Sequence, residues 1–344
     1  MKNSVGIIGA TGYTGSELTR ILSKHKNVDL EMITSKSYAG KKISDIHPYL
    51  EGICDMELSK ADLNKISDLD LVFLALPHGV SMNFVKDIGM DGPRIVDLSG
   101  DFRLKDKKTY EQWYEMKHVF SEAIDQAVYG LPELFRKDIS NAQLVANPGC
   151  YPTSAILALM PAVKNNLIDL SNISVDSKSG VTGAGAKPNS VTHFPRANED
   201  FRAYKIGSHR HTPEMEEILS EKSSEKISLL FTPHLVPLNR GILTTIYSKA
   251  KKDITGEKLL SFYKEEYGKE PFVRIRKSPP NVQAVRGSNY CDLYPMYVKR
   301  TNQIVMISAI DNLVKGAAGQ AVQNMNIMLG FNEKEGVSHI PLSP

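Results

Sequence analysis

The sequence predicts an α/β protein with an N-terminal Rossmann-type dinucleotide-binding domain and an α+β catalytic domain that has a mixed or antiparallel sheet. Two observations predict this fold class. A short apolar strand, a glycine-rich turn and an amphipathic helix follow one another at the start of the chain, and strands with alternating apolar residues lie in its second half. The 344 residues exceed what one hydrophobic core usually serves, so we expect two domains.

We expect the domain boundary near the single cysteine in the middle of the chain. The Rossmann domain should occupy residues 1–149, and the catalytic and oligomerisation domain residues 150–310. Residues 311–344 should then return as a C-terminal helix and complete the first domain.

The composition restricts the class of partner. Hydrophobic residues are 41% and charged residues 24% of the chain, and the net charge of +3 is too small to indicate nucleic acid. The three cysteines, Cys54, Cys150 and Cys291, lack the spacing of a disulfide framework or a metal site. No signal-peptide pattern precedes the first strand, and no apolar run approaches the roughly 18 residues of a membrane helix. We therefore expect a cytoplasmic protein without a metal, a nucleic acid or a membrane partner.

The first predicted strand, residues 5–8, ends in a turn with a glycine at every third position. In the related GxGxxG fingerprint the first glycine allows a tight turn, the second lets the backbone approach a pyrophosphate, and the third lets the helix pack closely. The pyrophosphate then lies on the helix N-terminus. The alternative is a glycine-rich loop without a ligand. We predict a cofactor site formed by Gly9, Thr11, Gly12, Tyr13, Thr14 and Gly15.

The second predicted strand, residues 30–33, carries information on the type of cofactor. It leads into Thr34-Ser35-Lys36-Ser37, with no acidic residue after Glu31. An acidic residue there would bind the ribose hydroxyls of NAD and repel a 2′-phosphate, whereas hydroxyl groups and a lysine can hold that phosphate. Ser35 and Lys36 therefore favour NADP(H), unless they belong to a solvated loop.

Two further core strands are predicted at residues 69–76 and 94–99. The first ends in Pro77-His78-Gly79, where a Rossmann sheet presents its cofactor crevice. The second leads to Arg103, which is suited to a carboxylate or a phosphate. A lone arginine after a strand is more often a surface residue, and this alternative stays open.

Cys150 lies between a predicted fifth strand, residues 143–146, and a predicted helix, residues 154–160. At a strand-to-helix turn, free N–H groups and the positive end of the helix dipole favour a thiolate over a thiol. The alternative is a buried structural cysteine. Because Pro148-Gly149 and Pro152 indicate a shaped, accessible turn, we predict a nucleophile.

Two histidines, His209 and His211, flank Arg210. Thr212 and Pro213 predict the N-cap and the first residue of a helix, so both histidines should precede it in an extended segment and project to the same side. No third metal ligand is near, so acid/base and anion-binding roles fit better than a metal site. The alternative is a structural role for each histidine.

The rest of the second half predicts a sheet with one face covered by solvent or by another subunit. Its strands are expected at residues 173–179, 227–232, 241–247 and 304–310. Residues 179–187 form a second glycine-rich loop, suited to a phosphate or else a flexible hairpin. Residues 311–325 predict a helix whose small residues allow close packing, and we expect it to lie against the first domain.

Nine motifs, in order, resemble those of the N-acetyl-γ-glutamyl-phosphate reductases, the arginine-biosynthetic family of the semialdehyde dehydrogenase superfamily. The match runs from Gly6 to Asn326, and the motifs are GATGYTGSEL, LALPHG, VDLSGDFRL, YGLPEL, NPGCYPT, HRHTPE, HLVPLNRGI, RGSNYC and DNLVKGAAGQA. The resemblance implies a Rossmann domain, a catalytic domain from near Cys150, and a last helix that returns to the Rossmann domain. Thr182 stands where serine is common, which is a conservative exchange.

By this resemblance Cys150 is the nucleophile of an NADPH-dependent reduction that converts N-acetyl-γ-glutamyl phosphate to N-acetylglutamate γ-semialdehyde through a thioester. One histidine of the HRH motif is the acid/base, and the sequence does not separate His209 from His211. Motifs linked to the substrate or to the histidine contain Arg103, Arg210 and Glu214. Motifs linked to the cofactor contain Gly12, Thr14, Gly15, Ser35, Pro77, Gly180 and Asn312.

Two other functions compete with this one. A sister enzyme that reduces an aspartyl phosphate or a carrier-linked aminoadipyl phosphate would share the glycine turn and the cysteine, but HRHTPE and HLVPLNRGI are typical of the acetylglutamyl branch. A nucleotide-sensing protein without catalysis would not need both Cys150 and the His-Arg-His stretch. We expect a homodimer or homotetramer that acts on a small-molecule acyl phosphate.

Overall fold

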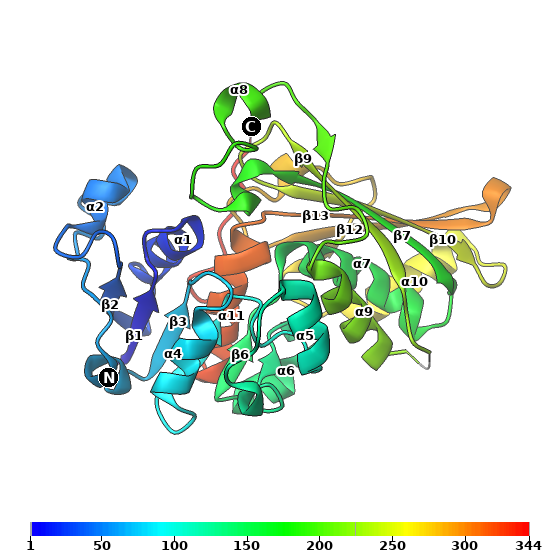
Figure 1. The fold of residues 1–344 in the computed structure, drawn as a ribbon. Helices are drawn as coiled ribbons and strands as arrows, with labels where there is room; N and C mark the ends of the chain where they lie inside the picture. Colours follow the sequence, from blue (N-terminus) through cyan, green and yellow to red (C-terminus); the bar gives the residue numbers. More distant parts are fainter. Residues whose placement is uncertain (1, 224, 344) are drawn as a thin grey trace. The chain divides into compact units, whose positions relative to one another are not determined.

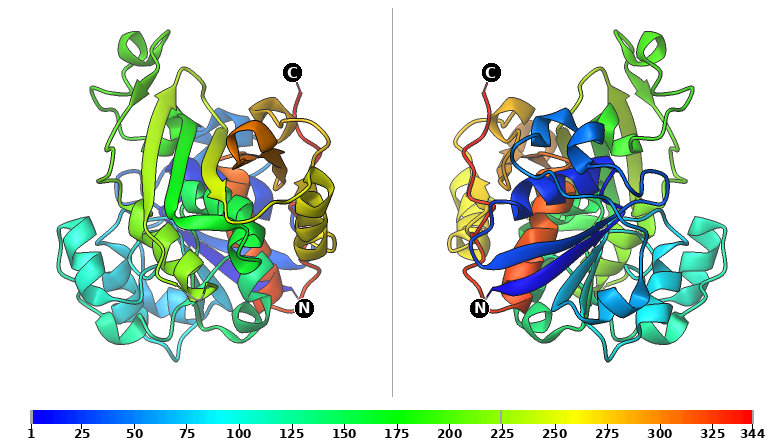
Figure 2. Two further views of the ribbon diagram at one scale, coloured as in Figure 1. Left: turned by 90° about the vertical axis from the view of Figure 1, so that its right-hand side faces the viewer. Right: turned by 90° about the vertical axis from the view of Figure 1, so that its left-hand side faces the viewer.

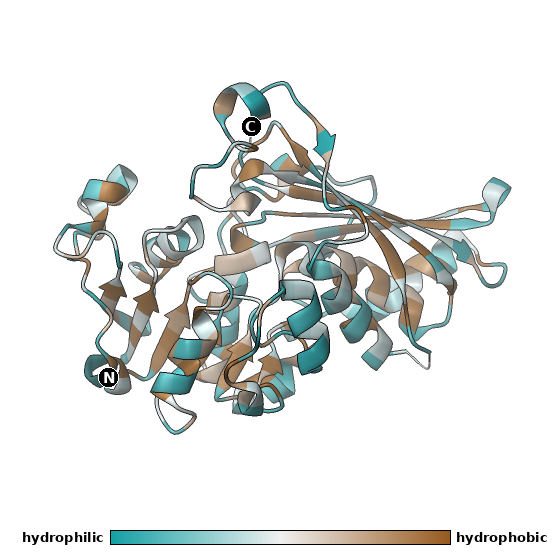
Figure 3. Ribbon diagram, viewed as in Figure 1, coloured by the Kyte–Doolittle hydropathy of each residue, from teal (hydrophilic) through white to brown (hydrophobic). Residues whose placement is uncertain are grey.

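The computed structural model describes residues 2–223 and 225–343, and these residues form two compact units. Unit 1 extends to Pro148 and includes Ala317–His339, whereas unit 2 consists of Gly149–Gly316 and the segment from Ile340 onward. Each unit has its own sheet. The strands of unit 1 are largely apolar, whereas those of unit 2 alternate between apolar and polar residues (Figure 3), and buried apolar side chains give each unit its own core.

Unit 1 is built on a six-stranded parallel sheet in the order β2-β1-β3-β4-β6-β5 (Figures 1 and 2). Its strands are β1 (Asn3–Ile8), β2 (Val28–Thr34), β3 (Leu71–Leu74), β4 (Arg94–Asp97), β5 (Val128–Tyr129) and β6 (Leu144–Ala146). Every residue of β3 is buried, as in parallel sheets with both faces covered. The strand order reverses between β1 and β3, so their carboxyl ends flank the crevice where such sheets bind ligands.

Helices cover the sheet of unit 1. They are α1 (Tyr13–Leu22), α2 (Ile43–Ile46), η1 (Pro48–Leu50), α3 (Leu63–Ser67), α4 (Ser81–Ile88), α5 (Lys107–Tyr114), η2 (Ser121–Ala123), α6 (Pro132–Asn141) and α11 (Gly319–Met328). Helix α11 comes from the C-terminal part of the chain, packs against α1, α6 and β4, and is drawn in red beside the blue strands in Figure 2. Its buried Asn324 donates to the Gly130 carbonyl oxygen at 2.8 Å, which fixes the helix against the segment before α6.

Unit 2 contains a seven-stranded mixed sheet in the order β11-β12-β13-β10-β7-β9-β8. Its strands are β7 (Ile168–Gly180), β8 (Arg202–Ala203), β9 (Leu229–Val236), β10 (Ile242–Ala250), β11 (Val273–Ile275), β12 (Cys291–Val298) and β13 (Gln303–Ile310). The helices are α7 (Cys150–Lys164), η3 (Val181–Ala184), α8 (Phe194–Ala197), α9 (His211–Glu221), α10 (Gly256–Tyr267), η4 (Val282–Ala284) and η5 (Lys299–Thr301). The π-helical turn η6 (Val314–Ala318) begins in unit 2 and ends in unit 1. No helix in the described part of the chain is long and apolar enough to cross a membrane.

Helices α7 and α10 pack on one face of this sheet (Figure 1). All residues of α7 from Tyr151 to Val163 are buried, which explains why its sequence is apolar on all sides. A chain of buried hydroxyl groups fixes the start of α7 on the sheet. Ser154 Oγ donates to Thr244 Oγ1 of β10 at 2.9 Å and lies 2.6 Å from Ser308 Oγ of β13.

The other face of the sheet carries side chains that alternate with the buried ones. The strand registers place four apolar residues and Ser174 in one row across β9, β7, β10, β13 and β12. The apolar residues of this row are Leu230, Tyr247, Val305 and Met296, and three of them, Leu230, Tyr247 and Met296, are exposed. We call these four residues the apolar row.

The predicted fold class is confirmed, because a parallel Rossmann-type sheet precedes a mixed sheet with helices. One element prediction is wrong, and two short elements were not predicted. The two-residue strand β5 was not predicted, because so short a strand carries no periodicity. Residues 181–184 form the 3₁₀ helix η3 where a hairpin was the alternative. Residues 311–325 are not one α-helix, because the Gly316 N–H group donates to the Asp311 carbonyl oxygen at 2.9 Å, a π-type bond across five residues. Val314–Ala318 therefore form the turn η6, and the α-helix begins only at Gly319.

Candidate active site

Cys150 is the first residue of α7, with Gly149 as the N-cap, so the predicted strand-to-helix turn is confirmed. The cysteine is half-buried, whereas Cys54 and Cys291 are buried. Pro152 is tolerated in the first turn, where its missing N–H group needs no helical partner. The N–H groups of this turn and the helix dipole therefore act on a partly accessible thiol.

Two contacts fix the position of Cys150 in unit 2. The Gly149 N–H group donates to Glu214 Oε1 of α9 at 2.8 Å, and Glu214 is only 1% exposed. On another side, a Cβ atom on Gly316 would lie 2.8 Å from the Cys150 Cβ atom, so only glycine fits there. The buried carboxylate thus holds the first turn of α9 at the start of α7.

The start of α9 differs from the prediction. The helix begins at His211 with Arg210 as the N-cap, two residues before the predicted start at Pro213. The reason is that His209 supplies the acceptors: its ring Nδ1 atom accepts the His211 N–H group at 3.1 Å, and its carbonyl oxygen accepts the Thr212 N–H group at 2.8 Å. A histidine ring therefore performs the capping role that the sequence assigned to Thr212.

Aromatic rings surround the two histidines. The ring centroids of His209 and His211 are 4.7 Å apart, and the Tyr151 ring packs edge-on against both, at 5.5 and 5.9 Å. The Tyr151 and Tyr204 hydroxyl groups share a hydrogen bond of 3.0 Å, and the Tyr204 ring meets His209 edge-on. Neither tyrosine was predicted as a site residue from the sequence, although Tyr151 follows the cysteine directly in the NPGCYPT motif.

The buried environment gives the His209 ring a lower pKa than that of an ordinary histidine. Burial, followed by the charges of Arg210 and Lys205, lowers the pKa of His209 to about 3. Because Nδ1 accepts a backbone N–H group, the proton of the neutral ring lies on Nε2. His209 is therefore a neutral hydrogen-bond donor near neutral pH. Within residues 2–223 and 225–343, no group of three or more His, Cys, Asp or Glu side chains is placed to hold a metal ion.

The pKa values of the two tyrosines near the cysteine are also shifted. Burial raises the pKa of Tyr204 to about 12, and the charge of Cys150 acts in the same direction. Burial likewise raises the pKa of Tyr151, with smaller contributions from Tyr204 and Cys150. Unit 2 thus brings Cys150, Tyr151, Tyr204 and the His-Arg-His stretch into one cluster.

Gly180 and Asn312, predicted to bind the cofactor, lie together in unit 2. The Asn312 side chain accepts the Gly241 N–H group at 2.7 Å and donates to Thr182 Oγ1 at 2.9 Å. A Cβ atom on Gly180 would lie 2.7 Å from the Asn239 carbonyl oxygen. Both residues therefore hold the loop after β7 against the turn before β10, and their contact with a cofactor stays a prediction.

The glycine turn of unit 1 has the shape of a nucleotide loop. Gly9 has a φ of +94°, and a Cβ atom there would lie 2.4 Å from the Ala75 carbonyl oxygen. A Cβ atom on Gly15 would lie 2.3 Å from the Gly9 carbonyl oxygen, whereas one on Gly12 would have nothing within 4 Å. Gly12 is the N-cap of α1 and provides no side-chain cap, so the space at this helix N-terminus can receive a phosphate.

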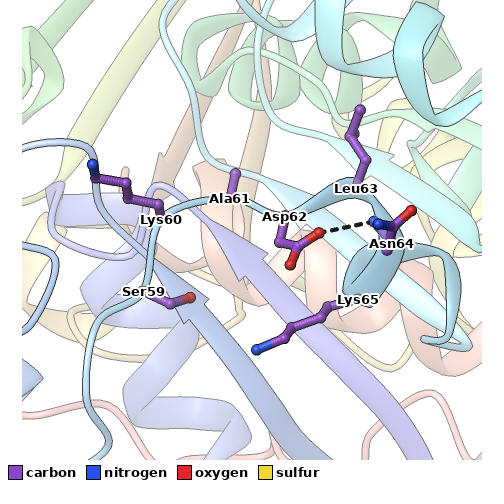
Figure 4. A pocket seen from close by; sticks show the side chains of 7 residues that line it. All are labelled: Ser59, Lys60, Ala61, Asp62, Leu63, Asn64 and Lys65. Carbon is purple, nitrogen blue, oxygen red and sulfur yellow. Dashed lines mark hydrogen bonds between the residues drawn. The ribbon is translucent and has the colours of Figure 1, made fainter.

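Ser35 lies at the end of β2, beside this turn. Its hydroxyl group shares a hydrogen bond of 3.1 Å with Thr11 Oγ1, and its N–H group donates to the Ser59 carbonyl oxygen at 3.0 Å. Ser35 is buried, whereas Lys36 is exposed. Ser59 begins a hollow of about 660 Å³ that is lined by residues 59–65, and the Lys65 side chain extends toward Ser59 (Figure 4).

Arg103 and Pro77 also lie in unit 1, after β4 and β3 respectively. Arg103 is only 6% exposed, so the alternative of a surface arginine is wrong. Its Nε atom donates to the Asn147 carbonyl oxygen at 2.8 Å and its Nη2 atom to the Leu98 carbonyl oxygen at 2.9 Å. These bonds hold the guanidinium group in place, and its contact with a substrate stays a prediction.

The comparisons with known proteins first define the class. One family model, described as the semialdehyde dehydrogenase NAD binding domain, matches residues 4–142, and another, described as the semialdehyde dehydrogenase dimerisation domain, matches residues 150–312. The structure of aspartate semialdehyde dehydrogenase II from Vibrio cholerae aligns with a TM-score of 0.72 and 17% identity over 96% of this chain and 99% of that chain. The Candida albicans enzyme with NADP gives a TM-score of 0.71 and 15% identity over 96% of this chain and 99% of that chain. Such identities show the fold alone, which is that of the semialdehyde dehydrogenases.

Relatives with higher identity define the family. The N-acetyl-γ-glutamyl-phosphate reductase of Pelotomaculum thermopropionicum is 49% identical over the full length of both chains, and that of Methanocaldococcus jannaschii is 50% identical over 99% of each. The chain belongs to the N-acetyl-γ-glutamyl-phosphate reductase family. The resemblance drawn from the nine motifs is thereby confirmed, and the N-terminal part of the chain is a nicotinamide-dinucleotide-binding domain.

Proposed function

We propose that the protein catalyses the NADPH-dependent reductive dephosphorylation of N-acetyl-γ-glutamyl phosphate to N-acetylglutamate γ-semialdehyde, a step of arginine biosynthesis. The observation that carries this proposal is the cluster in unit 2, where the Gly149–Glu214 hydrogen bond holds α9 at the Cys150 turn. The full-length relatives that bear the name of this reductase support it. The free cysteines suit the reducing cytoplasm, in which we propose that it acts.

The first step that we propose is attack of the Cys150 thiolate on the acyl carbon of the substrate. The new C–S bond forms while the C–O bond to phosphate breaks, so inorganic phosphate leaves with the electron pair and a thioester remains on Cys150. When bound, the nicotinamide supplies the hydride that reduces this thioester. Removal of the hydroxyl proton from the resulting thiohemiacetal expels the thiolate and releases the aldehyde.

We assign the proton transfers to His211. It lies three residues before Glu214 on α9, so both side chains are on the same face of the helix. Since Glu214 contacts Gly149, this face is turned toward Cys150. His209 does not suit the role, because its ring Nδ1 accepts a backbone bond and its pKa is about 3. His209 instead donates its Nε2 proton, which suits an oxygen of the substrate.

The negative charges of the substrate require cations. His209 is neutral and supplies none, so we propose that Arg210 and Arg103 bind the carboxylate and the phosphate, as the motifs imply. Arg210 already lies close enough to His209 to lower its pKa. The Glu214 carboxylate is engaged with Gly149, so we give it a positioning role for α9.

We propose NADP(H) as the cofactor. The glycine turn before α1 is suited to the pyrophosphate, and Ser35, with no acidic residue beside it, is suited to the 2′-phosphate. The hollow at residues 59–65 begins next to Ser35 and contributes Lys60 and Lys65, whose charges favour a phosphate over a plain ribose. Pro77, Gly180 and Asn312 are proposed contacts of the same cofactor.

We propose that unit 2 is also the oligomerisation domain of a homodimer or homotetramer. A family model described as a dimerisation domain matches it. The apolar row lies on the sheet face opposite α7 and α10, next to the His234–Asp176 pair with its Nδ1–Oδ1 distance of 3.0 Å. Exposed apolar residues gathered on one face, with polar groups beside them, are typical of an interface with a second copy.

The first prediction concerns the reaction. With NADP⁺ and N-acetylglutamate semialdehyde, the wild-type protein should form NADPH only when inorganic phosphate is present, and much more slowly with aspartate semialdehyde. Cys150→Ser should lower this rate by orders of magnitude while NADPH still binds, because a serine hydroxyl is far from ionised at neutral pH. Iodoacetamide should inactivate by alkylating Cys150, and Cys291→Ser is the matched control. Full activity of Cys150→Ser would contradict covalent catalysis.

The second prediction separates the two histidines. His211→Asn should lower kcat by roughly 10²- to 10⁴-fold and remove one limb of the pH profile. His209→Asn should mainly raise KM, because it removes a contact made equally to substrate and transition state. In ¹⁵N NMR of the wild-type protein, His209 should stay neutral with its proton on Nε2 down to about pH 4. A His209 titration near pH 6.5, or the reversed kinetic pattern, would sink this assignment.

The third prediction concerns cofactor choice. The wild-type protein should prefer NADPH to NADH, and Ser35→Asp should shift the ratio of kcat/KM values toward NADH by about tenfold or more, because a carboxylate repels the 2′-phosphate. Ser37→Asp places the same charge two residues further along, at an exposed position, and should shift the ratio less. Equal use of both cofactors by the wild-type protein would refute the preference.

The fourth prediction concerns assembly. The double variant Leu230→Glu, Tyr247→Glu should dissociate the oligomer in light scattering, because it places charges in a buried apolar interface. Phe194→Glu is the control, since this residue is 75% exposed and belongs to α8 rather than to a strand of the sheet. The proposed interface is wrong if the double variant keeps the wild-type mass.

A further inference from the structure

The loop between β3 and α4 is one wall of the crevice in unit 1. The strand order reverses between β1 and β3, so the loop after β1 and the loop after β3 flank the place where a ligand binds. The two loops touch, because a Cβ atom on Gly9 would lie 2.4 Å from the Ala75 carbonyl oxygen. The two loops therefore leave β1 and β3 in contact with each other, at the place where such sheets bind a ligand.

One buried carboxylate from a neighbouring loop holds this wall. Asp101 follows β4 and has no exposed surface. The Gly79 N–H group donates to its two carboxylate oxygens at 2.9 and 3.0 Å, and the Met82 N–H group donates to Oδ2 at 3.0 Å. Hydrogen bonds to an ionised group are among the stronger ones in proteins. Both ends of the turn that begins α4 are thus tied to one side chain.

The same carboxylate fills the anion position at the N-terminus of α4. Met82 is the second residue of that helix, so its N–H group has no partner within the helix. With Asp101 there, the helix dipole is already balanced by a charge that belongs to the protein. The phosphates of a dinucleotide are therefore directed to the open N-terminus of α1, where a Cβ atom on Gly12 would meet nothing within 4 Å.

Further contacts join the loop after β3 to the loop after β4 and hold Asp101 in place. The Gly100 N–H group donates to His78 Nδ1 at 2.7 Å, which adds a second link between the loops. The Tyr110 hydroxyl group also donates to Asp101 Oδ1, at 2.9 Å. His118 Nε2 lies 2.8 Å from the Asp101 carbonyl oxygen. Residues of α5 and of the segment after α5 therefore hold Asp101 in place independently of its bonds to Gly79 and Met82.

We propose that Asp101 is a positioning residue that holds residues 77–82 in the shape that accepts the dinucleotide. Arg103 lies two residues further along the same loop, so one segment sets both the cofactor wall and the predicted substrate arginine. This inference rests on the proposed function, since it takes the crevice of unit 1 to be the NADPH site.

The experiment compares Asp101→Asn with Tyr110→Phe. In Asp101→Asn an amide NH₂ group replaces one carboxylate oxygen, so a donor faces the backbone N–H groups where an acceptor was. The dissociation constant for NADPH, measured by fluorescence titration, should therefore rise by roughly tenfold or more. Tyr110→Phe removes a bond to the same carboxylate but leaves Gly79 and Met82 bound, so it should bind NADPH nearly as the wild type does. The rate of Cys150 alkylation, a property of unit 2, should be the same in all three proteins.

A second measurement does not depend on the folding of a variant. In the cofactor-free wild-type protein, the Gly79 and Met82 amides should exchange slowly with deuterium, because both donate to a buried carboxylate. Fast exchange of these amides would overturn the inference, as would unchanged NADPH binding by a folded Asp101→Asn, or equal weakening by Tyr110→Phe. If the wild-type protein bound no NADPH at all, the proposed function would fail instead.

Discussion

The geometry of the active-site cluster depends on the hydrogen bond between the Gly149 N–H group and the Glu214 carboxylate. Glu214 lies in the first turn of α9, and it accepts from the N-cap of α7, so two helix N-termini meet at one buried negative charge. Both helix dipoles favour a carboxylate there, which offsets much of the cost of burying it. This arrangement fixes the distance between the start of each helix without a bond between Cys150 and His211 themselves.

A buried carboxylate near a thiol has an electrostatic cost, because it opposes the formation of a thiolate. The Glu214 charge is engaged with a backbone donor, and the dipole of α7 acts on Cys150 in the opposite direction. The cluster therefore combines a group that positions the proposed nucleophile with a helix whose dipole favours its thiolate. His209 adds no charge to this balance, because burial keeps its ring neutral.

Much of the fold and of the cluster was predictable, because some residue patterns are compatible with only one local backbone structure. Gly9 and Gly15 are such cases, since any Cβ atom there would collide with the backbone. The capping of α9 was not predictable, because Thr212-Pro213 is a common helix start and nothing local shows that the His209 ring accepts the His211 N–H group. Tyr204 was missed because its contact with Tyr151 joins distant parts of the sequence.

The role proposed for Asp101 was hidden for a related reason. An aspartate after Ser99-Gly100 is typical of an exposed turn, whereas the structure buries it completely. Its partners Gly79 and Met82 are backbone groups of another loop, and a backbone donor leaves no trace in the sequence. Arg103 was ambiguous for the same reason, since its observed acceptors are carbonyl oxygens.

The edge strands of the mixed sheet limit its extension by strands of other molecules. Its outermost strands, β8 and β11, have only two and three residues. Such short borders offer few unpaired backbone groups, so another strand cannot extend the sheet sideways into a fibre. The broad face, where we propose the interface, is left for association, and a contact of like faces related by a two-fold axis closes on itself. Self-limiting assembly is thus favoured by the brevity of two strands rather than by any residue in the active site.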